Sequence, residues 1–291
     1  MSLPRRVKAV VFDMDGLLFD SESVYRDAMI ATAAQMGFEL PDRLFRRLIG
    51  VPWAGNVTML LEHYGSAFDH EAFRQEATRR FHVVADAEIC LKAGVVEILD
   101  ELDMLGLPRA VATSSMHPTV QHHLGQHDLL GRFHALVAQG DYARGKPAPD
   151  PFLTAAERLD VDPADCLALE DSHNGVRAAH AAGMMTIMVP DLLDATEEMR
   201  SLCIRIAHDL HEVRELLVLL QLLGEAFAFV AEVGAVEAGD VNGGAAQAQL
   251  RDDVSADIRG GSGGEGDGCR PVPLFAHIPQ PRVLGPEVVA P

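Results

Sequence analysis

Short apolar runs recur along the first two thirds of the chain, and a cluster of polar or small residues follows each of them. Runs of this kind are typical of strands that are buried on both faces of a sheet. Between them lie amphipathic stretches with helix-like ends, such as 95–105 before Gly106 and 150–159 after Pro149. This alternation predicts an α/β fold with a doubly wound parallel sheet. The predicted strands are residues 7–12, 108–112, 135–138, 166–169 and 185–189.

Residues 21–86 break this alternation. They contain no clear strand pattern, but the spacing of their apolar residues predicts several helices. Because the segment follows the first strand directly, and sites in parallel sheets lie at the carboxyl ends of the strands, we expect these helices to cover the site as a small cap. The catalytic core is then predicted to comprise residues 7–20 and 87–217. The cap helices are predicted at 23–36, 42–49, 56–63 and 71–84.

Residues 218–291 differ in composition from the rest of the chain. From position 221 onward there are 12 of the 25 Gly, 6 of the 16 Pro and no Lys, so this part offers little apolar surface for a core. A low-complexity run at 260–268 adds to this bias. The composition predicts a disordered C-terminal tail, or weak structure around residues 216–233.

The charge balance narrows the range of partners. Forty-three acidic and 24 basic residues give a net charge of −19, which opposes binding to nucleic acid or to anionic membranes. The four cysteines form no CxxC pair, and the N-terminal apolar run is too short for a signal peptide. No later stretch is apolar enough for a membrane span. We therefore expect a cytoplasmic protein, monomeric or homodimeric, with no nucleic-acid or membrane partner.

Candidate chemistry begins where the first predicted strand ends, at Asp13-Met14-Asp15-Gly16. A period of two places both carboxylates on the same side of the chain, and Gly16 permits the turn that follows. Two nearby carboxylates are costly unless a cation compensates them, and Mg²⁺ is suited to carboxylate and phosphate oxygens. Taken alone, the motif is more often a solvated turn with two acidic residues.

Further polar clusters lie at the ends of the other predicted strands. Thr113-Ser114-Ser115 offers hydroxyl and backbone N–H donors for an anion, and Lys146 begins a loop stiffened by two prolines. Each cluster alone is explained by a cap, a turn or a surface charge. Together they indicate a site at one edge of the sheet. The remaining cluster is Glu170-Asp171-Ser172, just before Asn174-Gly175.

In order and spacing, Asp13-Met14-Asp15-Gly16, Thr113, Lys146-Pro147 and Glu170-Asp171 resemble the haloacid dehalogenase superfamily of aspartate-nucleophile phosphatases, over about residues 8–191. The inserted helices are similar to the small cap of one subfamily. That subfamily contains β-phosphoglucomutase and many sugar-phosphate and nucleotide phosphatases. The resemblance implies a phosphatase that acts on a small phosphorylated metabolite, a sugar phosphate or a nucleoside monophosphate.

The resemblance also implies a role for each matching residue. Asp13 would attack phosphorus to give an aspartyl-phosphate, and Asp15 would act as general acid and then as general base. Thr113 and Ser114 would hold phosphoryl oxygens, and Lys146 would neutralise both Asp13 and the phosphate. The implied Mg²⁺ ligands are Asp13, the Asp15 carbonyl, Glu170 and Asp171.

Single positions distinguish a phosphatase from the alternative functions. A phosphomutase of this subfamily has a His shortly after the first strand and an Arg in the cap, where this chain has Tyr25 and Trp53. A metal-free dehalogenase lacks the second Asp, which is Asp15 here, and a non-catalytic binding module would be expected to lack one of these polar groups. Substrate choice is expected to depend on cap residues, chiefly Glu22 and Tyr25, with Arg26 and Trp53 near them.

Five histidines follow the second predicted strand, and two of them have the i, i+4 spacing of one helix face. No metalloprotease motif accompanies them, so a solvated helix face is predicted in place of a zinc site. These residues are His117, His122, His123, His127 and His134.

Overall fold

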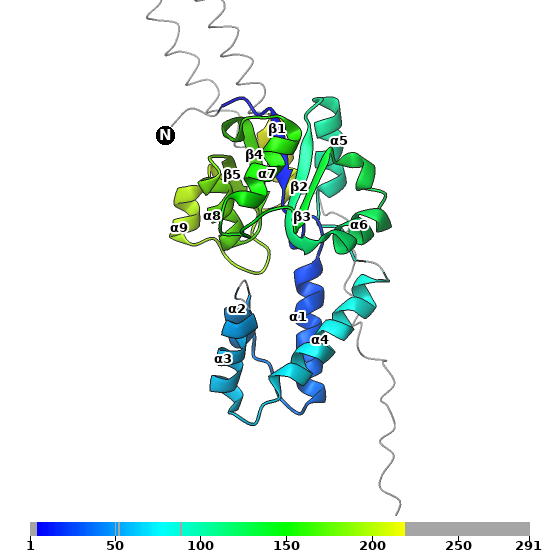
Figure 1. Cartoon of the computed structure of the whole chain (residues 1–291), viewed down its shortest axis with the longest axis vertical. Coiled ribbons are helices and arrows are strands. Elements are labelled where there is room, and N and C mark those ends of the chain that lie inside the picture. The colour runs from blue at the N-terminus through cyan, green and yellow to red at the C-terminus, as the bar shows by residue number, and fades with distance from the viewer. Residues whose placement is uncertain (1–4, 50, 52, 88, 219–291) are drawn as a thin grey trace, which may run out of the picture.

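A six-stranded parallel sheet forms the centre of the protein, with strand order β3-β2-β1-β4-β5-β6 (Figure 1). This is a computed structural model, and it describes residues 5–49, 51, 53–87 and 89–218. The predicted α/β fold with a parallel sheet is confirmed. The two-residue strand β6 was not predicted, because it is too short to carry a pattern. The strands are β1 (Ala9–Phe12), β2 (Arg109–Met116), β3 (Ala135–Gln139), β4 (Cys166–Glu170), β5 (Met185–Met188) and β6 (Arg205–Ile206).

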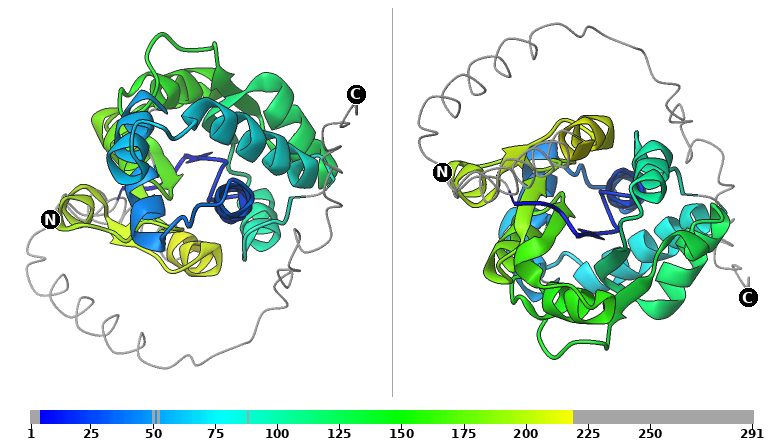
Figure 2. Two further views of the ribbon diagram at one scale, coloured as in Figure 1. Left: turned by 90° about the horizontal axis from the view of Figure 1, so that it is seen from below. Right: turned by 90° about the horizontal axis from the view of Figure 1, so that it is seen from above.

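Helices cover both faces of the sheet, as the end-on views of Figure 2 show. In β1, Val10 and Phe12 point into the apolar cluster under α5 (Val95–Met104) and α6 (His117–Gln126). Ala9 and Val11 point into the opposite cluster, under α7 (Asp150–Leu159) and α8 (His173–Ala181). All four side chains are fully buried, which explains why this strand reads as a continuous apolar run. A short helix, α9 (Glu197–Leu202), precedes β6.

The segment inserted after β1 folds into four helices that extend beyond one end of the sheet (Figure 1). They enclose an apolar cluster of their own, which includes Met29, Leu60 and Phe73. Leu192, from the loop after β5, packs against this cluster, so a core loop contacts the cap. The domain boundaries at 20/21 and 86/87 remain a prediction. The helices are α1 (Ser21–Gln35), α2 (Asp42–Leu48), α3 (Trp53–Tyr64) and α4 (His70–Ala85).

Two linkers join the cap helices to the sheet, and they run side by side. The N–H of Asp20 donates to the carbonyl of Cys90, and the N–H of Lys92 donates to the carbonyl of Leu18, both at 2.9 Å. The Lys92 ammonium also lies 2.7 Å from Oδ1 of Asp191, in the loop after β5. The paired linkers therefore hold the cap at the carboxyl edge of the sheet.

Helix α6 corrects the prediction of a solvated histidine face. His123 is 3% exposed, and its ring lies 5.6 Å from that of Phe19 in the first linker. Burial lowers the pKa of His123 below its ordinary value. His127 contacts the second linker through a 2.6 Å hydrogen bond between Nε2 and the Ile89 carbonyl. The prediction was wrong for His123 because the linkers, which are distant in sequence, pack on this face of the helix.

At its C-terminal end, the described chain packs residues 210–218 as a helix against the sheet through Leu210, Val213 and Leu217. The predicted tail, 218–291, lies outside the described residues except for its first position. In the described part of the chain, no helix combines the length and apolarity that a membrane span requires.

Candidate active site

Strand order brings three polar positions to one edge of the sheet. β1 pairs with β2 on one side and with β4 on the other, and Phe12 is in register with both Val111 and Leu169. Asp13, Thr113 and Glu170 each follow these positions by one or two residues, so they meet near the carboxyl edge of the three strands. Sites in parallel sheets form at such edges.

Lys146 reaches this edge from the loop after β3. Its ammonium contacts Oδ1 of Asp13 and lies 2.5 Å from Oε1 of Glu170. The side chain is buried and passes over the ring of Phe152, with Nζ 5.1 Å from the ring centroid. Burial alone would lower the pKa of Lys146, but the charges of Asp13 and Glu170 outweigh it and raise the pKa above its ordinary value. Lys146 therefore supplies a buried positive charge between Asp13 and Glu170.

Three buried carboxylates surround this position. Asp13, Glu170 and Asp171 each offer an oxygen, and these oxygens lie within 4.8 Å of one another. Burial has the largest influence on the pKa of two of these carboxyl groups. It raises the pKa of Asp13 to about 7, although the charge of Lys146 acts in the opposite direction. It also raises the pKa of Asp171 well above its ordinary range.

Lys146 alone does not balance this set of carboxylates. Oδ1 of Asp171 is buried and finds no hydrogen-bond donor among the described residues. Buried carboxylate oxygens without a donor are the ligands that a hard divalent cation prefers. The residues therefore fit a metal ion, with Asp13, Glu170 and Asp171 as its side-chain ligands.

Two glycines make room for these carboxylates. A Cβ at Gly175 would overlap the side chain of Glu170, and a Cβ at Gly16 would overlap that of Asp171. Gly16 also has a φ of +83°, a conformation that other residues rarely adopt. Glu170 is fixed further by Ser172, whose N–H and hydroxyl donate to Oε2 at 3.0 and 2.9 Å.

Asp15 points toward the end of β2. Its Oδ2 lies 2.7 Å from the hydroxyl of Ser115 and 3.5 Å from that of Thr113. Ser114, which lies between them in the chain, is exposed. The sequence named Ser115 only as the third member of the Thr-Ser-Ser run of possible anion donors. Its contact with Asp15 was not predicted.

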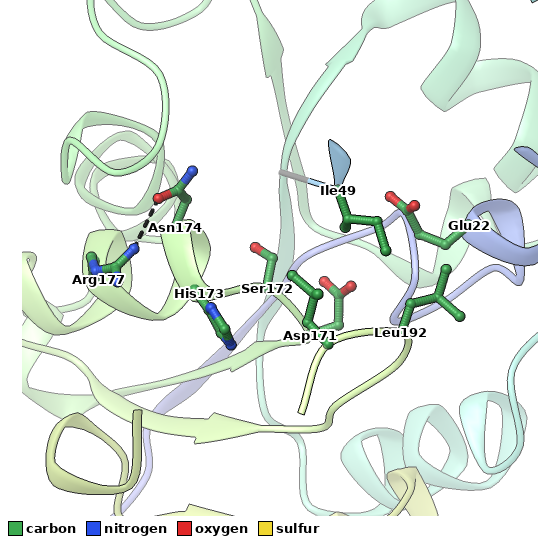
Figure 3. A pocket seen from close by; sticks show the side chains of 9 residues that line it. Glu22, Ile49, Asp171, Ser172, His173, Asn174, Arg177 and Leu192 are labelled. Atoms are coloured by element: carbon green, nitrogen blue, oxygen red, sulfur yellow. Dashed lines mark hydrogen bonds between the residues drawn. The ribbon is translucent and has the colours of Figure 1, made fainter. Parts of the chain in front are cut away.

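A cavity of about 200 Å³ lies between the cap and the core beside Asp171 (Figure 3). Glu22 lines it from the cap, while Asn174 and Arg177 line it from α8. Burial, followed by the charges of Asp15 and Asp191, raises the pKa of Glu22 to about 7. The structure thus places Glu22 on the same cavity as Asp171, and a contact between Glu22 and substrate remains a prediction.

The other cap residues named from the sequence lie elsewhere. Tyr25 is not among the described residues that line this cavity. Its ring packs edge-on against Phe81, with centroids 5.7 Å apart. Arg74 lies over the ring of Trp53, with 5.6 Å from the guanidinium carbon to the ring centroid. A direct contact between Tyr25 and substrate remains a prediction.

Comparisons with known proteins agree with this arrangement. Residues 7–183 match the family model of haloacid dehalogenase-like hydrolases. The chain is 37% identical over 194 residues to a probable pseudouridine-5'-phosphatase of Drosophila melanogaster, covering 64% of this chain and 83% of the relative. It is 34% identical over 196 residues to hexitol phosphatase B of Escherichia coli K12, covering 65% of this chain and 86% of the relative.

A solved structure, CbbY from Rhodobacter sphaeroides in complex with phosphate, superposes with a TM-score of 0.57 at 29% identity, covering 71% of this chain and 96% of that one. The matches to named phosphatases confirm the expected enzyme class, a phosphoric monoester hydrolase. With a family model that spans well over half of its length, this chain belongs to the haloacid dehalogenase-like hydrolases.

Proposed function

We propose that this protein is a Mg²⁺-dependent phosphatase that hydrolyses a small phosphorylated sugar or nucleoside monophosphate through an aspartyl-phosphate. The observation that supports this most is the position of Asp13, held by buried Lys146 beside Glu170 and Asp171. A carboxylate fixed next to a cation and a metal site can approach an anionic phosphate that would otherwise repel it.

In the first half of the reaction, an oxygen of Asp13 forms a bond to phosphorus while the ester P–O bond breaks. Asp15 gives its proton to the leaving oxygen. Lys146 offsets the negative charge of Asp13 and the phosphate, and the Thr113 hydroxyl and the Ser114 N–H donate hydrogen bonds to phosphoryl oxygens. The products are the free alcohol and a phosphorylated Asp13.

In the second half, Asp15 takes a proton from a water molecule. The water oxygen forms a bond to phosphorus while the bond between Asp13 and phosphorus breaks. Inorganic phosphate leaves, and Asp15 again holds the proton for the next turnover. The two carboxylates thus perform different tasks, although they are two residues apart.

Asp13, the Asp15 carbonyl, Glu170 and Asp171 would hold the Mg²⁺. When bound, this ion supplies positive charge that offsets the charge on the phosphoryl oxygens. The buried Oδ1 of Asp171, which has no donor among the described residues, supports this ligand set.

The cavity supports a small polar substrate. Its volume of about 200 Å³ and its position under the cap suit a metabolite better than a folded protein. Glu22 can accept hydrogen bonds from substrate hydroxyls, and Asn174 offers an amide on the other side of the cavity (Figure 3). The relatives named above act on a hexitol phosphate and on pseudouridine 5'-phosphate, which are both polyhydroxylated.

The test is phosphate release from a panel of phosphomonoesters, with added Mg²⁺ and with EDTA. We expect turnover of sugar phosphates or nucleoside monophosphates that stops when the metal is removed. Asp13→Asn should abolish turnover while circular dichroism shows an unchanged fold, because the amide keeps the shape but loses the nucleophilic charge. Substantial activity of this folded variant would overturn the aspartyl-phosphate route. Isomerised sugar phosphate without phosphate release would indicate a phosphomutase, and undiminished phosphate release without metal would overturn the Mg²⁺ dependence.

A further inference from the structure

The hydroxyl of Ser115 makes the shorter hydrogen bond to Asp15. It donates to Oδ2 at 2.7 Å, whereas the Thr113 hydroxyl lies 3.5 Å from the same oxygen. The Thr113 hydroxyl oxygen is already an acceptor, because the Ser115 N–H donates to it at 3.0 Å. Ser115 therefore both binds Asp15 and orients the hydroxyl beside it.

These contacts engage one oxygen of the Asp15 carboxyl. Within the described part of the chain, both hydrogen bonds to this carboxyl go to Oδ2, which leaves Oδ1 for proton exchange. A carboxyl at a strand end can rotate about two side-chain bonds, and a single short hydrogen bond limits that rotation. Proton transfer requires the donor and acceptor oxygens to lie within hydrogen-bond reach of each other.

A hydrogen bond to the neighbouring backbone also restrains Ser115. It lies in β2, beside the fully buried stretch that includes Thr113. The carbonyl of Thr113 accepts a 3.0 Å hydrogen bond from the hydroxyl of Tyr142. Ser115 lies in the stretch of β2 between Ala112 and Met116, where the pairing with β3 shifts register, and the Tyr142 hydrogen bond anchors this stretch at Thr113. The Ser115 hydroxyl thus reaches Asp15 although the two residues are 100 positions apart in the chain.

We propose that Ser115 is a positioning residue for Asp15: it fixes the carboxyl through Oδ2 so that Oδ1 gives and takes the proton. This inference rests on the proposed function. In the first half of the reaction the Oδ1–H bond breaks and the proton goes to the leaving oxygen. In the second half a water O–H bond breaks and its proton returns to Oδ1.

The experiment is a comparison of two substrates that differ in their need for a general acid. The alkyl substrate is the most active phosphomonoester of the panel, and the aryl substrate is p-nitrophenyl phosphate, whose leaving group departs without protonation. Ser115→Ala should lower kcat/KM for the alkyl ester by about tenfold to a hundredfold, the scale of a misplaced catalytic group. For p-nitrophenyl phosphate, kcat/KM should change by less than about threefold, because no acid is needed in that step.

A second readout follows from the base role of Asp15. Hydrolysis of phosphorylated Asp13 still needs the base, so Ser115→Ala should show a burst of nitrophenolate before a slower steady state. Ser115→Thr keeps the hydroxyl and should restore the wild-type ratio between the two substrates. In the double variant with Asp15→Asn, removal of the hydroxyl should cause no further loss, because the group it positions is already absent.

Each outcome has a separate meaning. If Ser115→Ala raises KM equally for both substrates and leaves kcat unchanged, Ser115 binds substrate and the positioning role is overturned. If Ser115→Ala and Asp15→Asn lower activity additively, the two residues act independently and the role is again overturned. If folded Asp15→Asn keeps full activity on the alkyl ester, the acid–base assignment of the proposed function fails instead.

Discussion

Replacement of Lys146 by Met removes the ammonium group that contacts Asp13 and Glu170 but keeps most of the apolar stem. The two carboxylates stay buried, because neither side chain is more than 9% exposed. Loss of one partner from a buried ion pair typically costs about 3–5 kcal/mol, since it leaves an uncompensated charge. We therefore expect Lys146→Met to lower the free energy of unfolding by about that amount in metal-free buffer.

Thermal unfolding measures this change. For a domain of this size a loss of about 3–5 kcal/mol lowers Tm by roughly 6–20 °C. A divalent cation can replace part of the missing charge, so saturating Mg²⁺ should raise Tm more in the variant than in the wild type. Phosphate release in saturating Mg²⁺ should be lost in the variant, because Asp13 then lacks the ammonium group that holds it.

Lys8→Met is the matched control. Lys8 makes an ion pair of similar length, 2.8 Å to Asp165, but its side chain is 61% exposed. Surface pairs contribute about 0–1 kcal/mol, so this variant should unfold nearly as the wild type does. Equal stability of Lys146→Met and Lys8→Met in metal-free buffer would refute the view that Lys146 compensates buried carboxylates.

Two further variants test other parts of the structure. Gly175→Ala should displace the Glu170 carboxylate, lower the free energy of unfolding by about 1–3 kcal/mol and reduce phosphate release. The control is Gly131→Ala, whose Cβ would meet nothing within 4 Å, and it should leave stability and phosphate release unchanged. Similar thermal and activity profiles for the two alanine variants would contradict this. The hydrogen bond from Arg158 holds the pKa of Asp141 below its ordinary value, so Asp141 stabilises the fold above its unfolded pKa and this contribution fades on acidification. Asp141→Asn should therefore lower the free energy of unfolding most near neutral pH and less in acid, as measured by urea unfolding. An equal loss at both pH values would argue against the ion pair.

Local patterns allowed the sheet and most of the site to be predicted from the sequence. All five predicted strands are present, because strands buried on both faces need continuous apolar runs and leave that trace in the sequence. Asp13, Thr113, Lys146 and Glu170 were also predicted, since each follows an apolar run that predicts a strand, and parallel strands end at the same edge. Strand order then determined which of these ends are neighbours.

Contacts between distant segments were not predictable in the same way. Nothing in the Thr-Ser-Ser run indicates that Ser115, and not the exposed Ser114, reaches Asp15. The burial of His123 depends on linkers that return from the cap, and Tyr25 packs on Phe81 because α1 and α4 lie together.

The sequence by itself determined the strands, the inserted helices and the residue types at the strand ends, because periodicity and turn residues depend only on neighbouring positions in the chain. Only the tertiary structure decided which of those side chains are buried together. It placed Gly175 against Glu170 and left Oδ1 of Asp171 without a donor among the described residues. The physical reason is that burial and hydrogen bonding depend on distances between segments far apart in sequence, and no local pattern records those distances.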